Sequence, residues 1–221
     1  MNWLPRNVSS FGGDVDSIFA LIFYVVGIWF VATQVYMLIC LVRFHRSQNQ
    51  RSDYIPGKTF SQLAWVLVPC ALVLILDLWI DFRGADVWAK IKIERPEPDL
   101  KVHLNARQFN WTFTHPGPDG KLGTRDDKKF DNDLHVPVDK VVRVTMTAKD
   151  VIHSLFIPEM RLKQDIVPGR EIPAWFKATQ TGRFEIPCAE LCGVGHTGMK
   201  GFLFVHSSQS YKKWLKENWP G

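Results

Sequence analysis

Two long stretches without charged side chains constrain this chain more than any other feature. Residues 18–42 contain no charged side chain, and residues 59–76 contain none either. About 20 apolar residues are enough to cross the hydrocarbon core of a bilayer as a helix. Asp77 and Asp81 then follow the second stretch. The sequence therefore predicts two transmembrane helices, over 18–42 and 59–81, that face membrane lipid.

The charges that flank these helices predict their orientation. The segment 43–58 between them carries four basic residues and one acid, which are Arg43, Arg46, Arg51, Lys58 and Asp53. The N-terminal segment 1–17 carries Arg6 against Asp14 and Asp16. Basic loops stay in the cytoplasm. We therefore expect a protein of the bacterial cytoplasmic (inner) membrane, with a cytoplasmic loop over 43–58 and with both termini on the periplasmic side.

The remainder of the chain has the pattern of a β domain. A Pro-rich hinge, "RPEPDL", ends a predicted linker over 82–100. In "KVVRVTMTA" (residues 140–148) apolar and polar residues alternate with a period of two, as in a half-buried strand, and "IPAWFKA", "GRFEIP" and "GFLFVHS" are further strand candidates. These short strands predict a small β-sandwich or barrel over 101–221.

Charge and acidic clusters exclude or weaken two other kinds of binding. The net charge is +5, but Lys and Arg are scattered without a basic run, so we expect no nucleic-acid partner. The segment 115–133 is a polar stretch rich in aspartate. These acids suggest calcium as an alternative, but the spacing is not that of an EF-hand, and a solvated loop is the prediction.

The stretch "PCAELCGVGHTGMKG" concentrates soft metal-ligand chemistry in one short segment. It contains Cys188, Cys192, His196 and Met199. A disulfide would leave the His and the Met unexplained, and a zinc site has no use for a thioether. Thiolate, imidazole and thioether together favour copper, and a mononuclear site needs only one Cys. Two thiolates able to bridge favour a pair of copper ions.

A second imidazole is found upstream. His153 lies in "DVIHSLFIP", directly after the alternating strand. By itself such a histidine would more often be a surface residue than a ligand. Together with the Cys–Met segment it is a candidate ligand.

These motifs, in this order, resemble subunit II of haem–copper cytochrome c oxidases. The resemblance rests on His153-Ser, on "LKQDIVPGR" (residues 162–170) and on the pattern Cys188-x-Glu190-x-Cys192-x3-His196-x2-Met199. It covers nearly the whole chain and implies a two-helix hairpin followed by an all-β cupredoxin-like extracytoplasmic domain.

The resemblance also implies how each of these residues acts. The sulfurs of Cys188 and Cys192 would bridge the two coppers of a centre called CuA, with His153 and His196 as terminal ligands. Met199 would be a weak axial ligand, and Glu190 a ligand through its backbone carbonyl. The carboxylate of Glu190 would face a magnesium or manganese ion shared with subunit I.

Two positions differ from the usual pattern of that family. Phe109 stands where a surface tryptophan usually receives electrons, while Trp111 is retained. Gln62 stands where a glutamate usually opens a proton channel, and glutamine has no ionisable carboxylate. The route by which electrons reach the copper centre is therefore assigned to Phe109 and Trp111 only as an expectation.

The function implied by the resemblance is that of a respiratory electron carrier in an enzyme complex. The chain would accept electrons from a c-type cytochrome, dedicated or bound in a larger assembly, and pass them to the haems of subunit I. Oxygen reduction and proton translocation would belong to the complex, since this chain offers no haem ligands for them. The alternative is a membrane-anchored cupredoxin-like copper electron carrier or copper-delivery protein.

Overall fold

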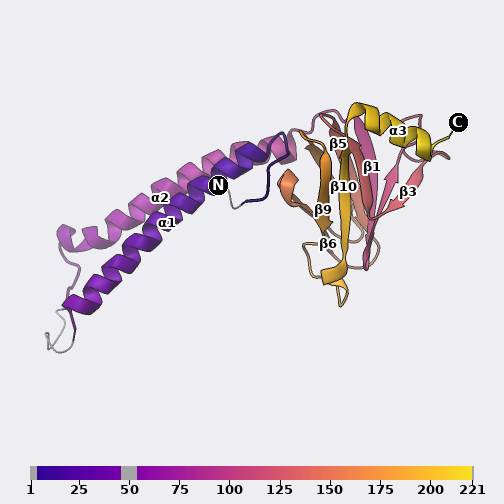
Figure 1. Cartoon of the computed structure of the whole chain (residues 1–221). Helices are drawn as coiled ribbons and strands as arrows, with labels where there is room; N and C mark the ends of the chain where they lie inside the picture. Colours follow the sequence, from indigo (N-terminus) through magenta and orange to yellow (C-terminus); the bar gives the residue numbers. More distant parts are fainter. Residues whose placement is uncertain (1–3, 46–53, 221) are drawn as a thin grey trace. The chain divides into compact units, whose positions relative to one another are not determined.

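The computed structural model describes residues 4–45 and 54–220 of the chain (Figure 1). Two compact units are distinguished: Asp16–Ala89, and Met1–Val15 together with Lys90–Gly221. The first unit is helical and the second is rich in strands. Residues 46–53, half of the predicted cytoplasmic loop 43–58, lie outside the described residues.

The helical unit contains most of α1 (Gly12–Arg43) and all of α2 (Phe60–Trp88), which a short π-helix, η1 (Ala89–Ile93), continues. Both helices are long and apolar enough to cross a membrane, and the apolar window of neither is buried. The two predicted apolar helices are thus confirmed. α1 begins before residue 18, and α2 runs past residue 81 into the segment predicted as a linker, because nothing in 82–88 breaks a helix.

The start of α2 uses the residue that departs from the family pattern. Thr59 is the N-cap, and Gln62 follows it in the first turn. The side-chain oxygen of Gln62 accepts a hydrogen bond from the backbone N–H of Lys58 at 3.0 Å. This contact resembles half of a capping box, in which a Glu or Gln reaches back to the chain before the helix.

The second unit is a β-sandwich, which confirms the predicted β-rich domain. Its larger sheet has the strand order β3-β2-β1-β5-β8, a second sheet has the order β4-β10-β9, and β6 pairs with β7. The strands are β1 (Leu100–Arg107), β2 (Asn110–His115), β3 (Lys128–Asp131), β4 (Asp133–Pro137), β5 (Val141–Ala148), β6 (His153–Ile157), β7 (Leu162–Ile166), β8 (Ile172–Lys177), β9 (Gly182–Pro187) and β10 (Lys200–His206).

The core of the sandwich follows the alternation read from the sequence. In β5, Val142, Val144 and Met146 are buried, whereas Arg143 and Thr145 are only partly buried on the outer face. The strand pairs with β1 in parallel and with β8 antiparallel. Because successive side chains of a strand point to opposite faces, one set fills the core and the other faces outward.

The N-terminal segment contributes to this core. Val8 and Phe11 are buried in it, with exposed fractions of 0% and 1%. The N–H of Val8 donates to the carbonyl of Glu159 at 2.9 Å, and Val8 in turn accepts from Thr179 at 2.9 Å. Residues predicted as a separate segment over 1–17 thus include a part of the β domain.

Two elements differ in kind from what was predicted for their segments. β3 lies inside the segment 115–133, where only a polar loop was expected, and it pairs antiparallel with β2. The helix α3 (Ser208–Asn218) packs against β4 and β10 and buries Trp214. The hydroxyl of Ser207 caps α3 by accepting from the N–H of Ser210 at 3.2 Å.

Candidate metal centre

The segment between β9 and β10 presents the sulfur ligands. Its base is closed by β-sheet pairing of Pro187 with Lys200 and by a hydrogen bond from the N–H of Cys188 to the carbonyl of Met199 at 3.0 Å. The N–H of Ala189 donates to the carbonyl of Ser154 in β6 at 3.1 Å. The loop is therefore fixed to two strands at the point where the first cysteine lies.

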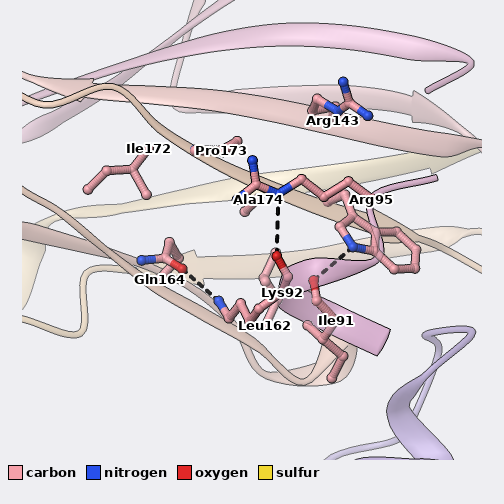
Figure 2. Close-up of a pocket in the computed structure, with 10 residues that line it drawn as sticks. Ile91, Lys92, Arg95, Arg143, Leu162, Gln164, Ile172, Pro173 and Ala174 are labelled. Atoms are coloured by element: carbon pink, nitrogen blue, oxygen red, sulfur yellow. Dashed lines mark hydrogen bonds between the residues drawn. The ribbon is translucent and has the colours of Figure 1, made fainter. Parts of the chain in front are cut away.

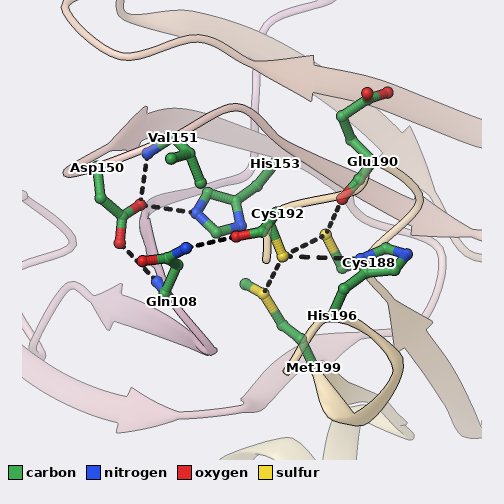
Figure 3. Close-up of polar contacts among 9 residues, drawn as sticks. All are labelled: Gln108, Asp150, Val151, His153, Cys188, Glu190, Cys192, His196 and Met199. Carbon is green, nitrogen blue, oxygen red and sulfur yellow. Dashed lines mark hydrogen bonds and ion pairs between the residues drawn. The ribbon is translucent and has the colours of Figure 1, made fainter. Parts of the chain in front are cut away.

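Four of the predicted ligands converge around the sulfur of Cys192 (Figure 3). This sulfur lies 3.9 Å from Sγ of Cys188, 3.6 Å from Nδ1 of His196 and 3.7 Å from Sδ of Met199. Both cysteines are free thiols, since a disulfide would bring their sulfurs to about 2.05 Å. Cys188, Cys192 and Met199 are buried and belong to the hydrophobic core of the domain, so these ligand atoms are shielded from solvent.

His153, the first residue of β6, brings the second imidazole to the same place. Its side chain is 0% exposed, and its donor atom and those of Cys188 and Cys192 lie within 4.8 Å of one another. Among the described residues, Nδ1 of His153 has no hydrogen-bond partner. A buried polar atom without a partner is destabilising. The ring nitrogen is therefore suited to act as a metal ligand.

The other ring nitrogen of His153 is held by Asp150. Nε2 of His153 lies 2.8 Å from Oδ1 of Asp150. The carboxylate also accepts from the N–H groups of Gln108 and Val151, each at 2.7 Å. Desolvation raises the pKa of Asp150, but these hydrogen bonds outweigh it and leave the pKa below its ordinary value. Metal-binding histidines commonly donate their second nitrogen to a carboxylate in this way.

Asp150 is a residue of the candidate site that the sequence reasoning missed. The signal was present in the spacing Asp150-x-x-His153, which places the carboxylate at the turn before β6.

Burial also sets the chemistry of the cysteines. Burial first, and then the neighbouring Cys188, raises the pKa of Cys192 to about 11. Without metal the Cys192 thiol is therefore protonated near neutral pH. Because thiolates are the forms that bind metal, loading this site must release protons.

The turn between β1 and β2 covers residues 188–199, which carry the sulfur ligands and are called the ligand loop here. The side-chain amide of Gln108 donates to the carbonyl of Cys192 at 2.5 Å. The ring of Phe109 packs so closely on Gly195 that a Cβ there would lie 2.5 Å from Cδ2 of the ring. Gly193 has φ 131°, a backbone conformation that favours glycine. The structure thus places Phe109 directly against the predicted copper loop.

Trp111 lies deeper than Phe109. It is fully buried, and its indole N–H donates to the carbonyl of Ile186 at 3.1 Å. Its ring meets that of His153 edge-on, with centroids 6.0 Å apart. Trp111 therefore supports the imidazole from within the core, and Phe109 is the partly buried aromatic ring at the turn.

Glu190 presents two different groups in two directions. Its backbone carbonyl lies 3.3 Å from Sγ of Cys188, on the side of the sulfur cluster. Figure 3 shows its carboxylate pointing away from the cysteine sulfurs. The carbonyl and the carboxylate are thus available to different partners.

The donor set is that of a copper site. Thiolates, imidazoles and a thioether are ligands that copper accepts together, whereas structural zinc sites do not use methionine. Gln62 lies in the helical unit and takes no part in this cluster.

Comparisons with known proteins identify the family of the chain. The profile of the family "Cytochrome C oxidase subunit II, periplasmic domain" matches residues 104–204. The alternative cytochrome c oxidase subunit 2 of Bradyrhizobium diazoefficiens is 30% identical, over 97% of this chain and 83% of its own length. A cytochrome c oxidase subunit 2 of Synechocystis is 27% identical, over 98% and 76%.

A solved structure is also similar. The periplasmic domain of subunit II of the cytochrome oxidase of Bradyrhizobium japonicum is 33% identical, with a TM-score of 0.49 over 56% of this chain and 95% of that one. The identity and coverage of the Bradyrhizobium diazoefficiens relative establish the relationship. The chain belongs to the cytochrome c oxidase subunit II family.

Proposed function

We propose that this chain is the electron-accepting subunit of a respiratory cytochrome c oxidase. It takes electrons from a c-type cytochrome and passes them to the haems of subunit I, where oxygen is reduced to water and protons are translocated. The observation that carries the proposal is the convergence of two thiols, two imidazoles, a thioether and a backbone carbonyl in one cluster, in which all members but His196 and Glu190 are buried.

The ligand set of this cluster is proposed to hold a dinuclear copper centre, CuA. The bridging ligands would be Cys188 and Cys192, and the terminal ones His153 and His196. Met199 and the carbonyl of Glu190 would complete the set. When bound, the centre would supply a one-electron redox couple delocalised over two soft-ligated ions.

The protein around this cluster holds its candidate ligands in place. Asp150 orients His153, and the pairing of the loop with β6 and β10 fixes the distance between the two cysteines. Ligands held in advance change position little when the charge of the site changes. This rigidity suits electron transfer, which is slowed by rearrangement of the site.

The electron-accepting surface is proposed to lie around Phe109. Its ring packs on the ligand loop, and in the same loop the apolar side chains of Leu191 and Val194 are exposed. Exposed apolar groups of this kind are typical of protein interaction sites. A phenyl ring excludes water at the contact but lacks the indole N–H of the usual tryptophan.

The carboxylate of Glu190 is proposed to bind a magnesium or manganese ion shared with subunit I. Carboxylate oxygens are ligands that both ions prefer. The supporting observation is that this carboxylate points away from the sulfur cluster and is therefore available to a second partner.

The experiment that tests the proposal measures copper and its electronic state in the purified complex. Two coppers per chain, with hyperfine structure from an unpaired electron shared by two copper nuclei, would support the dinuclear centre. One copper per chain with the spectrum of a single nucleus would contradict it and would favour a cupredoxin-like carrier or copper-delivery protein.

The identity of the electron donor is tested separately. The aspartates in the segment 115–133 could attract a basic cytochrome, but Lys128 and Lys129 interrupt them. Surface charge pairs contribute little energy each, and salt screens them beyond about 8–10 Å. We therefore propose a dedicated or complex-bound cytochrome. Slow reduction by soluble cytochrome c, together with full turnover in the intact membrane complex, would support this. Fast, steeply salt-dependent reduction that is lost in Phe109→Ala would contradict it.

A further inference from the structure

A cavity on the outer face of the larger sheet is lined by three cationic side chains. It has a volume of ≈ 150 Å³ and lies between the segment after α2 and the strands β5, β7 and β8 (Figure 2). Lys92 and Arg95 come from that segment, and Arg143 comes from β5. No carboxylate lines the cavity among the described residues. The cavity is separate from the ligand loop, which contributes none of its walls.

The cationic groups are held in place by neutral partners. Nζ of Lys92 donates to the side-chain oxygen of Gln164 at 2.6 Å, and Nε of Arg95 donates to the carbonyl of Lys92 at 3.3 Å. Arg143 donates to the carbonyl of Pro96 at 2.9 Å. The carbonyl partners of Arg95 and Arg143 fix these two side chains without neutralising their charge. Among the described residues, neither Arg95 nor Arg143 is in a salt bridge.

One carboxylate acts on this group of charges from outside the cavity. Asp165 interacts with Lys92, but its Oδ1 already accepts from Lys163 and from Ser154, each at 2.7 Å. Burial first, and then the charge of Arg95, lowers the pKa of Lys92, and Asp165 only partly opposes this. The positive charge around the cavity is therefore incompletely compensated.

A hydrogen bond between two other residues of the cavity wall holds that wall together. The ring of Trp175 lines it and donates through its indole N–H to the carbonyl of Ile91 at 2.9 Å. This bond ties the segment after α2 to β8. A water molecule occupies roughly 30 Å³ of liquid, so the cavity has room for a small polyatomic ion with some of its water.

We propose that this cavity binds a tetrahedral oxyanion, the phosphate group of either free phosphate or an anionic lipid. Guanidinium groups are suited to this chemistry because their N–H donors match the oxygens of a phosphate in pairs. Two guanidinium groups and an ammonium group around one small space provide more charge than one phosphate carries. The bound anion would connect the segment after α2 to β5.

The test is calorimetric titration of the purified oxidase complex with sodium phosphate at constant ionic strength, with sodium chloride as the reference. We expect one saturable site per chain. Replacing both guanidinium groups, Arg95→Gln with Arg143→Gln, should weaken binding roughly ten-fold or more. The matched control, Arg125→Gln with Lys129→Gln, removes two exposed cations outside the cavity and should leave the affinity unchanged.

A second titration distinguishes the source of the phosphate. Dihexanoylphosphatidylglycerol, below the concentration at which it forms micelles, should bind more tightly than free phosphate if the natural ligand is a lipid. It should bind no more tightly if the ligand is free phosphate. In both cases the Arg95 and Arg143 variant should lose the binding.

Three results would overturn the proposal. They are an absence of saturable binding by either probe, equal affinity in the double variant and the wild type, and binding to the isolated chain but not to the complex. The last result would mean that another subunit closes the cavity.

Circular dichroism reports folding independently of copper. If the double variant does not assemble, Arg95→Gln alone gives the same test, because the side chain of Arg95 is exposed. The inference does not depend on the copper assignment.

Discussion

Asp150 and His153 form a pair in which the carboxylate fixes the imidazole: Oδ1 and Nε2 are 2.8 Å apart, and the ring is fully buried. Asp150→Ala should leave His153 unheld and lower the copper affinity by about 10–100-fold. Asp150→Asn, which keeps an oxygen acceptor without the charge, should be milder. The copper retained by each of the two variants in the presence of a competing chelator measures these effects. Equal retention in Asp150→Ala and the wild type would contradict a positioning role.

The two sulfur types of the cluster should respond differently to substitution. Cys192→Ser should abolish the near-infrared absorption of a mixed-valence copper pair, because serine offers no soft bridging thiolate. Met199→Leu should shift the reduction potential and leave copper partly bound, since only a weak ligand is lost. An unchanged near-infrared band in Cys192→Ser would rule out the dinuclear assignment.

Two glycines of the ligand loop provide a matched pair of substitutions. In Gly195→Ala the new methyl group would lie 2.5 Å from the Phe109 ring, whereas in Gly198→Ala it would meet nothing within 4 Å. Overpacking of this kind costs about 1–3 kcal/mol. We therefore expect Gly195→Ala to lower the midpoint of thermal unfolding and slow reduction by cytochrome c. Gly198→Ala should do neither, and equal effects of the two changes would contradict the close approach of Phe109.

A cluster of histidines beneath α3, of which His115 is buried and His135 half-buried, should make the β domain sensitive to acid. Burial lowers the pKa of His115 to about 3 and that of His135 to about 4, in both cases with a smaller effect of a neighbouring histidine. In the unfolded chain these two histidines protonate near pH 6.5. Between pH 6.5 and their lower pKa values in the folded domain, the unfolded chain therefore binds more protons than the folded one. The contribution of the two uncharged histidines to the free energy of unfolding is fully present above pH 6.5 and is lost progressively as the pH falls below it.

For His115 alone the loss is about 1.4 kcal/mol per pH unit within that window. Thermal unfolding of the purified chain in detergent, compared at pH 7.5 and pH 5, measures it. His115→Phe keeps an aromatic ring against Phe130 and Trp214 but cannot be protonated, so its pH dependence should be weaker. The same pH dependence in this variant and the wild type would contradict the assignment.

The orientation in the membrane follows from the basic loop 43–58. A β-lactamase fused after the last residue, Gly221, should confer resistance, because that enzyme protects cells only from the periplasm. A truncated fusion after residue 50 should not. The opposite pattern would place the copper domain in the cytoplasm and exclude a periplasmic electron donor.

The parts of the molecule that the sequence predicted are those encoded by local patterns. Cys188 to Met199 form one short segment, and the uncharged stretches and the alternation in β5 are local as well. Contacts across the chain have no such signal. The hydrogen bond between the side chain of Gln108 and the carbonyl of Cys192 joins residues 84 positions apart, and neither segment contains a sequence pattern that predicts this contact.

Another feature had a signal in the sequence that was not used. Ser207 followed by the amphipathic run of α3 is an N-cap signature. The burial of Val8 and Phe11 was less accessible, because two apolar residues in a short segment fit many environments. Their place was decided by a gap in the sandwich that only the folded domain defines.

The position of Val8 and Phe11 has a consequence for biosynthesis. These residues leave the ribosome before α1, yet the core that surrounds them includes strands from the other end of the chain. This segment must therefore wait, exposed, until the strands that surround it have been delivered to the same side of the membrane. A tag fused ahead of Val8 would lie beside an unfinished core throughout this interval, whereas one fused after α3 would follow strands that have already been made.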